Sequence, residues 1–427
     1  MKPTVTYGST LVSKGRENEV EILLELTAPD APTSERQPLD VVAVIDRSGS
    51  MSGEPLQAVL RAVAQLLRLA GPNDRIGVVV FDTNVQTIVP LERHADVEAV
   101  AQRVLAVHSG GSTNLSGGWL KAMSILEESG RVEALKRIVL LTDGHANVGL
   151  STVEVFAPAV VAGRVKGITT SCIGFADGYD EEFLAAVADA GSGNDYWCAG
   201  PDQAMQVFTD EFNGLATVVA QNLEVVLAPT HTVRKVKVRH DFPVEKLDER
   251  CLRVSLGDSY GGETRKLLAT WKCHPREALG LVELGEITVK WVSVVGEPVS
   301  HAVTIPVSVK VVENASTVTD PDASPEVLRM AELMRAERAR RRARRAADAG
   351  DFQGAQAFLV VADAAFNSLG MADELSVVRE DLMSLRSNTW SPTQSKRAFS
   401  RSRSINKGRK SNYDDPSQSG SDDDSVR

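Results

Sequence analysis

Oxygen-bearing side chains gather in three short segments of this 427-residue sequence. The segments are Asp46-Arg47-Ser48-Gly49-Ser50, Gly110-Gly111-Ser112-Thr113-Asn114 and Thr142-Asp143-Gly144. Hard divalent cations prefer oxygen ligands, whereas softer metals need His or Cys, of which these segments have none. They therefore predict a site for Mg²⁺, or for Mn²⁺ or Ca²⁺, with five candidate ligands: Asp46, Ser48, Ser50, Thr113 and Asp143.

Strand and helix patterns alternate over residues 38–220 and are expected to bring these segments together. Residues 39–46 and 137–142 are continuous apolar runs that predict buried strands, and residues 56–69 have the apolar spacing of a helix. Such alternation favours a doubly wound, mostly parallel α/β sheet covered by helices on both faces. Ligands bind such sheets beyond the carboxyl ends of the strands, which is where the first and third segments fall.

The three segments resemble a known site. D-x-S-x-S at 46–50, Thr113 within G-G-S-T-N and T-D-G at 142–144 are similar to the metal-ion-dependent adhesion site (MIDAS) of von Willebrand factor type A (vWA) domains. A lone D-x-S-x-S would be weak, but three separated motifs agree in order and context. The element order also matches the vWA (Rossmann-like) fold over residues 38–220.

A further phrase narrows the resemblance to a subgroup of vWA proteins. Ile173-Gly174-Phe175, followed by Tyr179 and Gly193, is similar to calcium-activated-chloride-channel-like proteins, inter-α-trypsin-inhibitor heavy chains and plant RING–vWA proteins. The sequence has no Cys/His pattern for a RING domain, so ubiquitin ligation is not implied.

The resemblance implies a metal-ion-dependent protein-interaction module. Asp46, Ser48, Ser50 and Thr113 would ligate the cation, and Asp143 would do so directly or through water. A protein partner would offer an Asp or Glu as the last ligand. The bland alternative is that these residues only cap helices and shape turns, as Asp and Ser often do.

Two other classes of function stay open. A metal-dependent hydrolase would polarise a phosphoryl group with the same cation. However, we find no second carboxylate next to Asp46, no P-loop and no G-x-S-x-G motif, so we expect no enzyme. The second is a vWA subunit that works with an AAA+ ATPase. The ATPase would be a separate chain, because this sequence has no nucleotide-binding motif.

The rest of the chain divides into four regions by pattern. Residues 1–37 hold two short strands that we expect to join an antiparallel β-sandwich at 221–320. Helical patterns follow over 321–386, at 325–348, 351–368 and 371–386. The region 387–427 is rich in Ser, Arg, Lys and Asp, and we expect a disordered tail there.

Composition limits the partners and the compartment. The overall net charge of −10 makes polyanionic nucleic acid an unlikely partner, although the Arg run at 340–345 is locally basic. That run by default predicts a solvated helix face. No apolar run is long enough for a membrane span and the N-terminus has no signal-peptide pattern, so we expect a cytoplasmic protein without membrane contact. In the tail, Ser400, Ser402 and Ser404 alternate with Arg and are candidate phosphorylation sites.

Overall fold

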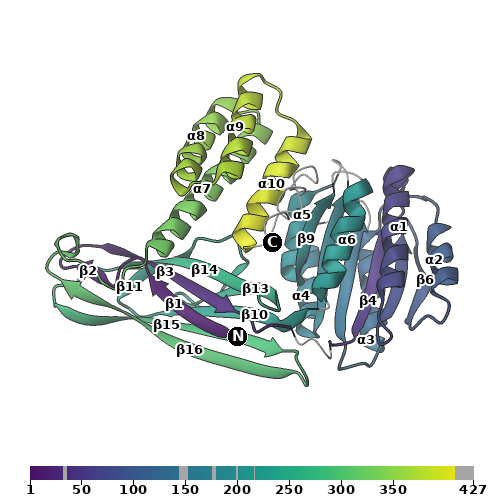
Figure 1. The fold of residues 1–427 in the computed structure, drawn as a ribbon, viewed down its shortest axis with the longest axis horizontal. Coiled ribbons are helices and arrows are strands. Elements are labelled where there is room, and N and C mark those ends of the chain that lie inside the picture. The colour runs from purple at the N-terminus through teal and green to yellow at the C-terminus, as the bar shows by residue number, and fades with distance from the viewer. Residues whose placement is uncertain (32–35, 144–151, 176–178, 199–200, 216, 409–427) are drawn as a thin grey trace, which may run out of the picture. The chain divides into compact units, whose positions relative to one another are not determined.

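The computed structural model describes residues 1–31, 36–143, 152–175, 179–198, 201–215 and 217–408. The chain forms two compact units. One contains residues 1–238 and 242–324, and the other contains residues 239–241 and the region from Pro325 onward. The first unit holds an α/β part and a β-rich part (Figure 1).

The α/β part is built on a six-stranded sheet with the strand order β6-β5-β4-β7-β8-β9. All neighbours pair in parallel except β5 and β6, which are antiparallel. Strands β4, β7 and β8 are buried along nearly their whole length, which explains their continuous apolar sequences. The strands are β4 (Leu39–Asp46), β5 (Arg75–Phe81), β6 (Val85–Glu92), β7 (Leu135–Thr142), β8 (Ile168–Phe175) and β9 (Ser192–Cys198).

Helices cover both faces of this sheet, as the sequence predicted. On one face α1, α2 and α6 share an apolar core with the strands. On the other, Trp119 of α3 meets Phe156 of α4 edge to face, and Phe156 stacks on Phe183 of α5. The helices are α1 (Glu54–Leu69), α2 (Val97–Leu105), α3 (Leu115–Glu128), α4 (Val153–Val165), α5 (Glu181–Ala190) and α6 (Pro201–Leu215).

The β-rich part is a sandwich of two sheets around a shared apolar core. Its sheet orders are β1-β3-β14-β11 and β12-β13-β10-β15-β16-β2. The N-terminal strands lie within it, because β3 pairs antiparallel with β14 and β2 pairs in parallel with β16. The strands are β1 (Lys2–Tyr7), β2 (Leu11–Ser13), β3 (Asn18–Thr27), β10 (Val218–Pro229), β11 (Val233–Val238), β12 (Val244–Lys246), β13 (Leu252–Tyr260), β14 (Thr264–Cys273), β15 (Gly280–Ser293) and β16 (Val299–Val312).

The second unit contains the three predicted helices and a fourth that the sequence analysis missed. The predicted ones are α7 (Pro325–Asp348), α8 (Phe352–Leu369) and α9 (Ala372–Arg386). Residues that we expected to be disordered instead form α10 (Pro392–Lys407). Its N-terminus has a capping box between Ser391 and Gln394, and Gly408 ends it in the left-handed conformation. The remainder of the expected tail, 409–427, lies outside the described residues.

The Arg run at 340–345 belongs to α7, and several of its side chains form ion pairs within this unit. Arg340 contacts Glu337 and Glu374 at 3.4 and 2.5 Å, Arg341 contacts Asp241 at 3.0 Å, and Arg344 contacts Asp348 at 3.6 Å. Arg340 and Arg344 are buried rather than solvated, so the default expectation for this run was wrong at these two positions. Among the described helices, none is both long enough and apolar enough to cross a membrane.

Candidate metal centre

Three neighbouring strands end in the candidate site. In the sheet, Asp46 of β4 lies beside Phe81 of β5, and Ile45 lies beside Leu141 of β7. The residues that end or directly follow these strands, Asp46, Asp82 and Asp143, therefore emerge at one edge of the sheet. We call the loops after β4, β5 and β7 the carboxyl edge.

Hydrogen bonds link four of the five predicted ligands into one chain. Asp46 accepts from the Ser48 backbone N–H at 2.8 Å and from the Thr142 hydroxyl at 2.6 Å. The Ser48 and Ser50 hydroxyls are 3.2 Å apart, and the Ser50 hydroxyl donates to Asp143 at 2.8 Å. Although Ser48 lies at the N-cap of a short 3₁₀ turn (Gly49–Met51), its side chain makes no capping hydrogen bond. Capping therefore does not explain this hydroxyl.

The fifth predicted ligand, Thr113, comes from a loop that packs on the first segment. The Gly49 N–H donates to the Gly111 carbonyl at 3.0 Å, and the Gly110 N–H donates to the Arg47 carbonyl at 2.7 Å. Thr113 is 3% exposed, and its hydroxyl has no hydrogen-bond partner among the described residues. The neighbouring Asn114 caps α3 by accepting from the Gly117 N–H at 3.1 Å, which leaves Thr113 out of the capping role.

The two ligand carboxylates are buried, and neither has a basic partner in the part of the chain that the structure describes. Asp46 is fully buried and Asp143 is 7% exposed. Burial raises the pKa of both, with smaller opposing effects from the Ser48 and Thr142 hydrogen bonds to Asp46 and the Ser50 hydrogen bond to Asp143. The charge of Asp46 further raises the pKa of Asp143. Within the described residues, neither carboxylate forms an ion pair with Lys, Arg or His.

A third carboxylate, Asp82, was missed by the sequence analysis. It directly follows β5, and its charge contributes to the raised pKa of Asp46. The sequence analysis did not place this carboxylate at the same edge as Asp46. Asp82 contacts Arg47 at 3.2 Å, and a side chain at Gly110 would displace its carboxylate. The signal was an acid at the end of the 75–81 strand, at the same edge as Asp46.

The chemistry of these donors fits a hard divalent cation. Carboxylates and hydroxyls are ligands that Mg²⁺ accepts while it retains waters. In the part of the chain that the structure describes, no group of three or more His, Cys, Asp and Glu side chains is arranged to hold a metal ion. A metal at the carboxyl edge would therefore depend on the Ser and Thr hydroxyls as well as the two Asp carboxylates.

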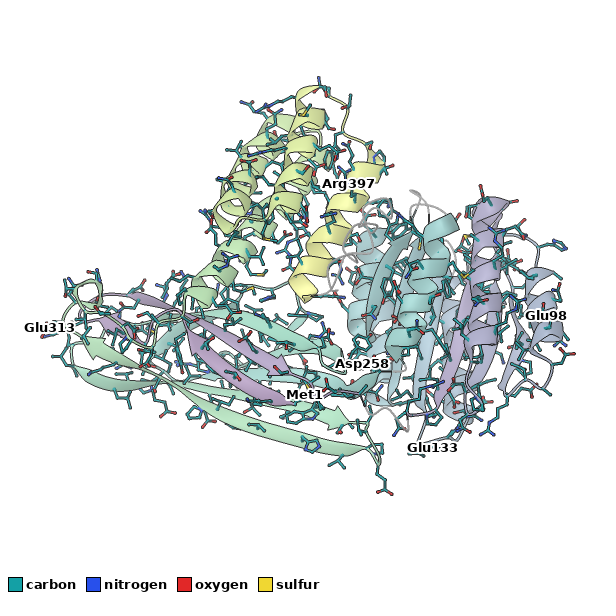
Figure 2. The ribbon with its side chains drawn as sticks, in the orientation of Figure 1. Met1, Glu98, Glu133, Asp258, Glu313 and Arg397 are labelled. Atoms are coloured by element: carbon teal, nitrogen blue, oxygen red, sulfur yellow. The ribbon has the colours of Figure 1, made fainter. Side chains whose placement is uncertain are left out.

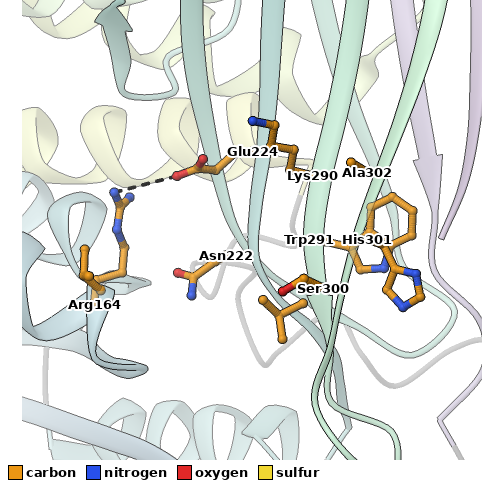
Figure 3. Close-up of a pocket in the computed structure, with 10 residues that line it drawn as sticks. Arg164, Asn222, Glu224, Lys290, Trp291, Ser300, His301 and Ala302 are labelled. Atoms are coloured by element: carbon orange, nitrogen blue, oxygen red, sulfur yellow. Dashed lines mark ion pairs between the residues drawn. The ribbon is translucent and has the colours of Figure 1, made fainter.

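A separate pocket of about 460 Å³ lies away from the carboxyl edge. Arg164 and Val165, from the end of α4, form one wall, and the sheet β10-β15-β16 forms the other (Figure 3). Arg164 contacts Glu224 across it at 3.8 Å, and the Trp291 ring stacks on His301 with centroids 5.0 Å apart. None of the five predicted ligands lines this pocket.

Comparison with known proteins agrees with this fold. Residues 40–213 match the model of the von Willebrand factor type A domain. The chain is similar to a solved vWA structure from Catenulispora acidiphila, with a TM-score of 0.70, 18% identity and 88% of each chain covered. It is also 25% identical to an uncharacterised protein of Synechocystis over 78% of this chain and 83% of that protein.

A third relative belongs to the subgroup suggested by the sequence. Inter-α-trypsin inhibitor heavy chain H4 of Homo sapiens is 31% identical over 38% of this chain, and the match spans only 18% of that protein's length. The α/β part of this chain is thus a vWA domain, as the motifs indicated, with a β-sandwich and a helical unit added to it.

Proposed function

We propose that this chain is a metal-ion-dependent protein-interaction module. A divalent cation, Mg²⁺ by preference, would be held at the carboxyl edge by Asp46, Ser48, Ser50, Thr113 and Asp143. The observation that carries the proposal is the pair of buried carboxylates, Asp46 and Asp143, linked through Ser48 and Ser50 without a basic partner in the described residues. A bound cation would neutralise the two charges that the fold leaves uncompensated.

The residues at this edge would divide the work. Hydrogen bonds from the Ser48 N–H and the Thr142 hydroxyl hold the Asp46 carboxylate in place. Asp46 would therefore be a pre-positioned ligand for the cation. Asp143 already accepts a hydrogen bond from the Ser50 hydroxyl, and it would bind the cation directly or through a water. A cation with few charged ligands keeps residual positive charge, which a partner's Asp or Glu side chain would complement as the last ligand.

The same proposal gives the chain no catalytic step and places it in the cytoplasm. All four cysteines are free thiols, which supports a reducing compartment. Turnover of a generic phosphoester that is lost in Asp46→Asn would overturn the non-catalytic part of the proposal.

Thermal unfolding of the full chain with Mg²⁺, Mn²⁺, Ca²⁺ or chelator tests the metal site. A ligand at 100 times its Kd stabilises a two-state domain by about 2.7 kcal/mol. We expect this gain in wild type and its loss in Asp46→Asn and Thr113→Ala. Asp96→Asn is the matched control, because Asp96 caps α2 away from the edge and Asn caps equally well. Equal gains in wild type and in both site variants would refute the site.

Binding to immobilised peptides that carry Asp or Glu, compared with their Asn or Gln versions, tests the interaction. We expect wild type to retain the acidic peptides in Mg²⁺ and to release them in chelator, and Thr113→Ala to retain none. Retention that persists in excess chelator would refute the role of the metal in binding.

A further inference from the structure

We propose that α10 carries two phosphorylation sites, Ser400 and Ser404, and that phosphate at these positions releases α10 from α9. Neither residue takes part in the carboxyl edge or in the proposed metal-dependent interaction. The inference rests on how α10 is held and on where the two hydroxyls lie along it.

Arginine side chains hold α10 against α9. Arg397 contacts Asp381 at 3.0 Å and Glu380 at 3.2 Å, and Arg401 contacts Glu374 at 2.8 Å. The contacts with Asp381 and Glu374 are shielded from water, since these acids are 1% and 11% exposed and Arg397 and Arg401 are 16% and 9% exposed, whereas Glu380 is 58% exposed. Figure 2 labels Arg397 on this helix. Helix α10 is therefore tied to α9 by these ion pairs, whereas it packs on α7, where the Phe399 ring lies 4.8 Å from the Arg344 guanidinium and Ser395 donates to Asp348 at 2.7 Å.

Each of the two serines follows one of these arginines by three positions. Ser400 is three residues after Arg397, and Ser404 is three residues after Arg401. Residues three apart on a helix are neighbours on its surface. Both serines are half-buried, and their hydroxyls form no hydrogen bond within the described residues. Their modification would therefore break no hydrogen bond of these hydroxyls within the described residues.

Ser402, between them, is in a different position. It is 1% exposed and lies beside the buried carboxylate of Glu337 on α7. A phosphate there would be buried and would face a like charge. We therefore assign the modification to Ser400 and Ser404 and exclude Ser402 in the folded chain.

The reaction needs a serine kinase and a nucleoside triphosphate. The serine Oγ would attack the γ-phosphorus, the bond from that phosphorus to the β–γ bridging oxygen would break, and the hydroxyl proton would pass to the kinase base. The nucleoside diphosphate leaves. A kinase with an acidic groove would recognise the Arg that precedes each acceptor by three residues, at moments when the ion pairs of that Arg with α9 are open.

Phosphate at these serines would compete for the arginines that dock the helix. A phosphoserine carries a charge of about −1.5 to −2 and three acceptor oxygens, and it pairs strongly with a neighbouring Arg. Arg397 and Arg401 would turn from the acids of α9 to the phosphates on their own helix. In addition, Ser404 lies in the last turn of α10, where its carbonyl accepts the cap N–H, and negative charge there opposes the helix dipole.

Hydrogen exchange of the full chain with phosphoserine installed at 400 and 404 tests the release. We expect the amides of residues 392–407 to exchange at least about tenfold faster, while those of α7 and α8 stay unchanged, because tenfold corresponds to about 1.4 kcal/mol. Ser376→Glu is the charge control, since Ser376 is exposed on α9 and lies outside these contacts. Unchanged protection of α10, or equal loss in the control, would overturn the release.

Treatment of the unmodified full chain with ATP and a serine kinase selective for Arg at the third position before the acceptor tests the sites. We expect peptide mapping to find phosphate on Ser400 and Ser404 and none on Ser402. Phosphate on Ser402 instead would overturn the assignment. A chain that stays unmodified while the free 392–408 peptide is phosphorylated would show that the docked helix is no substrate, and would also overturn it.

Discussion

The carboxyl edge and the helical unit both bury acidic side chains, but they neutralise them differently. In the helical unit, Glu374 is contacted by Arg340 and Arg401, and these arginines lower its pKa against the effect of burial. At the carboxyl edge, the donors to Asp46 and Asp143 among the described residues are hydroxyls and backbone N–H groups, and the pKa values of both carboxylates are raised. Within the described residues, the protein thus supplies cations to the acids of the helical unit and none to this pair.

The difference indicates where an external cation would have an effect. A buried carboxylate is tolerated when a guanidinium pairs with it, and removal of that guanidinium leaves an uncompensated charge. A carboxylate pair without a guanidinium is in that uncompensated condition from the start. Glu374 of the helical unit is compensated as folded, whereas the carboxyl edge would gain from a bound ion.

Removal of Arg340 should have the largest effect, because it breaks the compensation in the helical unit. Its guanidinium is buried, contacts Glu337 and Glu374, and lies 4.7 Å from the centroid of the Phe366 ring. We expect Arg340→Ala to lower the free energy of unfolding of this unit by about 3–5 kcal/mol. Native-state hydrogen exchange of residues 325–386 measures this loss.

Arg335→Ala is the matched control for that experiment. Arg335 is 60% exposed and pairs with Glu332 on the same helix, so its loss should stay within about 0.5 kcal/mol. A cost for Arg340→Ala as small as the control would contradict the contrast between the two regions.

The pH dependence of the helical unit should show that charge compensation there is incomplete at Asp381. Burial raises the pKa of Asp381 to about 6, even though Arg397 opposes this shift. The folded state therefore holds this proton more tightly than the unfolded state, whose Asp pKa is about 3.9. The resulting stabilisation is fully present below about pH 4 and is lost as the pH rises through 6, about 2–3 kcal/mol in all.

Comparison with Asp381→Asn isolates this contribution, because the variant has no proton to lose. We expect the unfolding free energy of the variant relative to wild type to rise by about 2–3 kcal/mol between pH 4 and pH 7. Urea denaturation of both chains, followed by the fluorescence of Trp390 on a background without the other tryptophans, gives this difference. A constant difference across the range would contradict the raised pKa.

Asp46→Asn should have the opposite sign from Arg340→Ala when no metal is present. Asn keeps an acceptor for the Ser48 N–H, and the Thr142 hydroxyl can rotate to accept from the amide. The variant also removes a buried charge that lies near Asp82 and Asp143. We expect it to stabilise the chain in chelator by about 1 kcal/mol, seen as a higher Tm. A lower Tm would mean that Asp46 is already compensated.

Arg47→Ala should sharpen the comparison with the smallest effect. Arg47 is the basic side chain that contacts Asp82, at 3.2 Å, so its loss makes the carboxyl edge more negative. We expect Mg²⁺ to bind about threefold more tightly, as measured by titration calorimetry at low salt. Arg103→Ala, an exposed position on α2, serves as the control. Weaker binding in Arg47→Ala would show that Arg47 supports the loop rather than balances its charge.

The sequence by itself determined the parts of this protein that depend on local pattern. Continuous apolar runs set the buried strands of the sheet, and the order of strand and helix set its parallel topology. The D-x-S-x-S, Thr113 and T-D-G segments could be placed at one edge because parallel strands end on the same side. Near neighbours in the sequence carry this information, through the spacing of apolar side chains.

Only the tertiary structure decided how the charges are matched. Asp82 joins Asp46 because β5 lies next to β4, and Arg401 meets Glu374 across 27 positions of sequence. The same reason explains why α10 was missed, although its Ser391–Gln394 box and Gly408 were visible in the sequence. Its composition is too polar for a core-forming helix, and it contacts α7 and the acids of α9, which no local pattern reveals. Burial of an ion pair is a property of two distant segments together, so it appears only once the chain is folded.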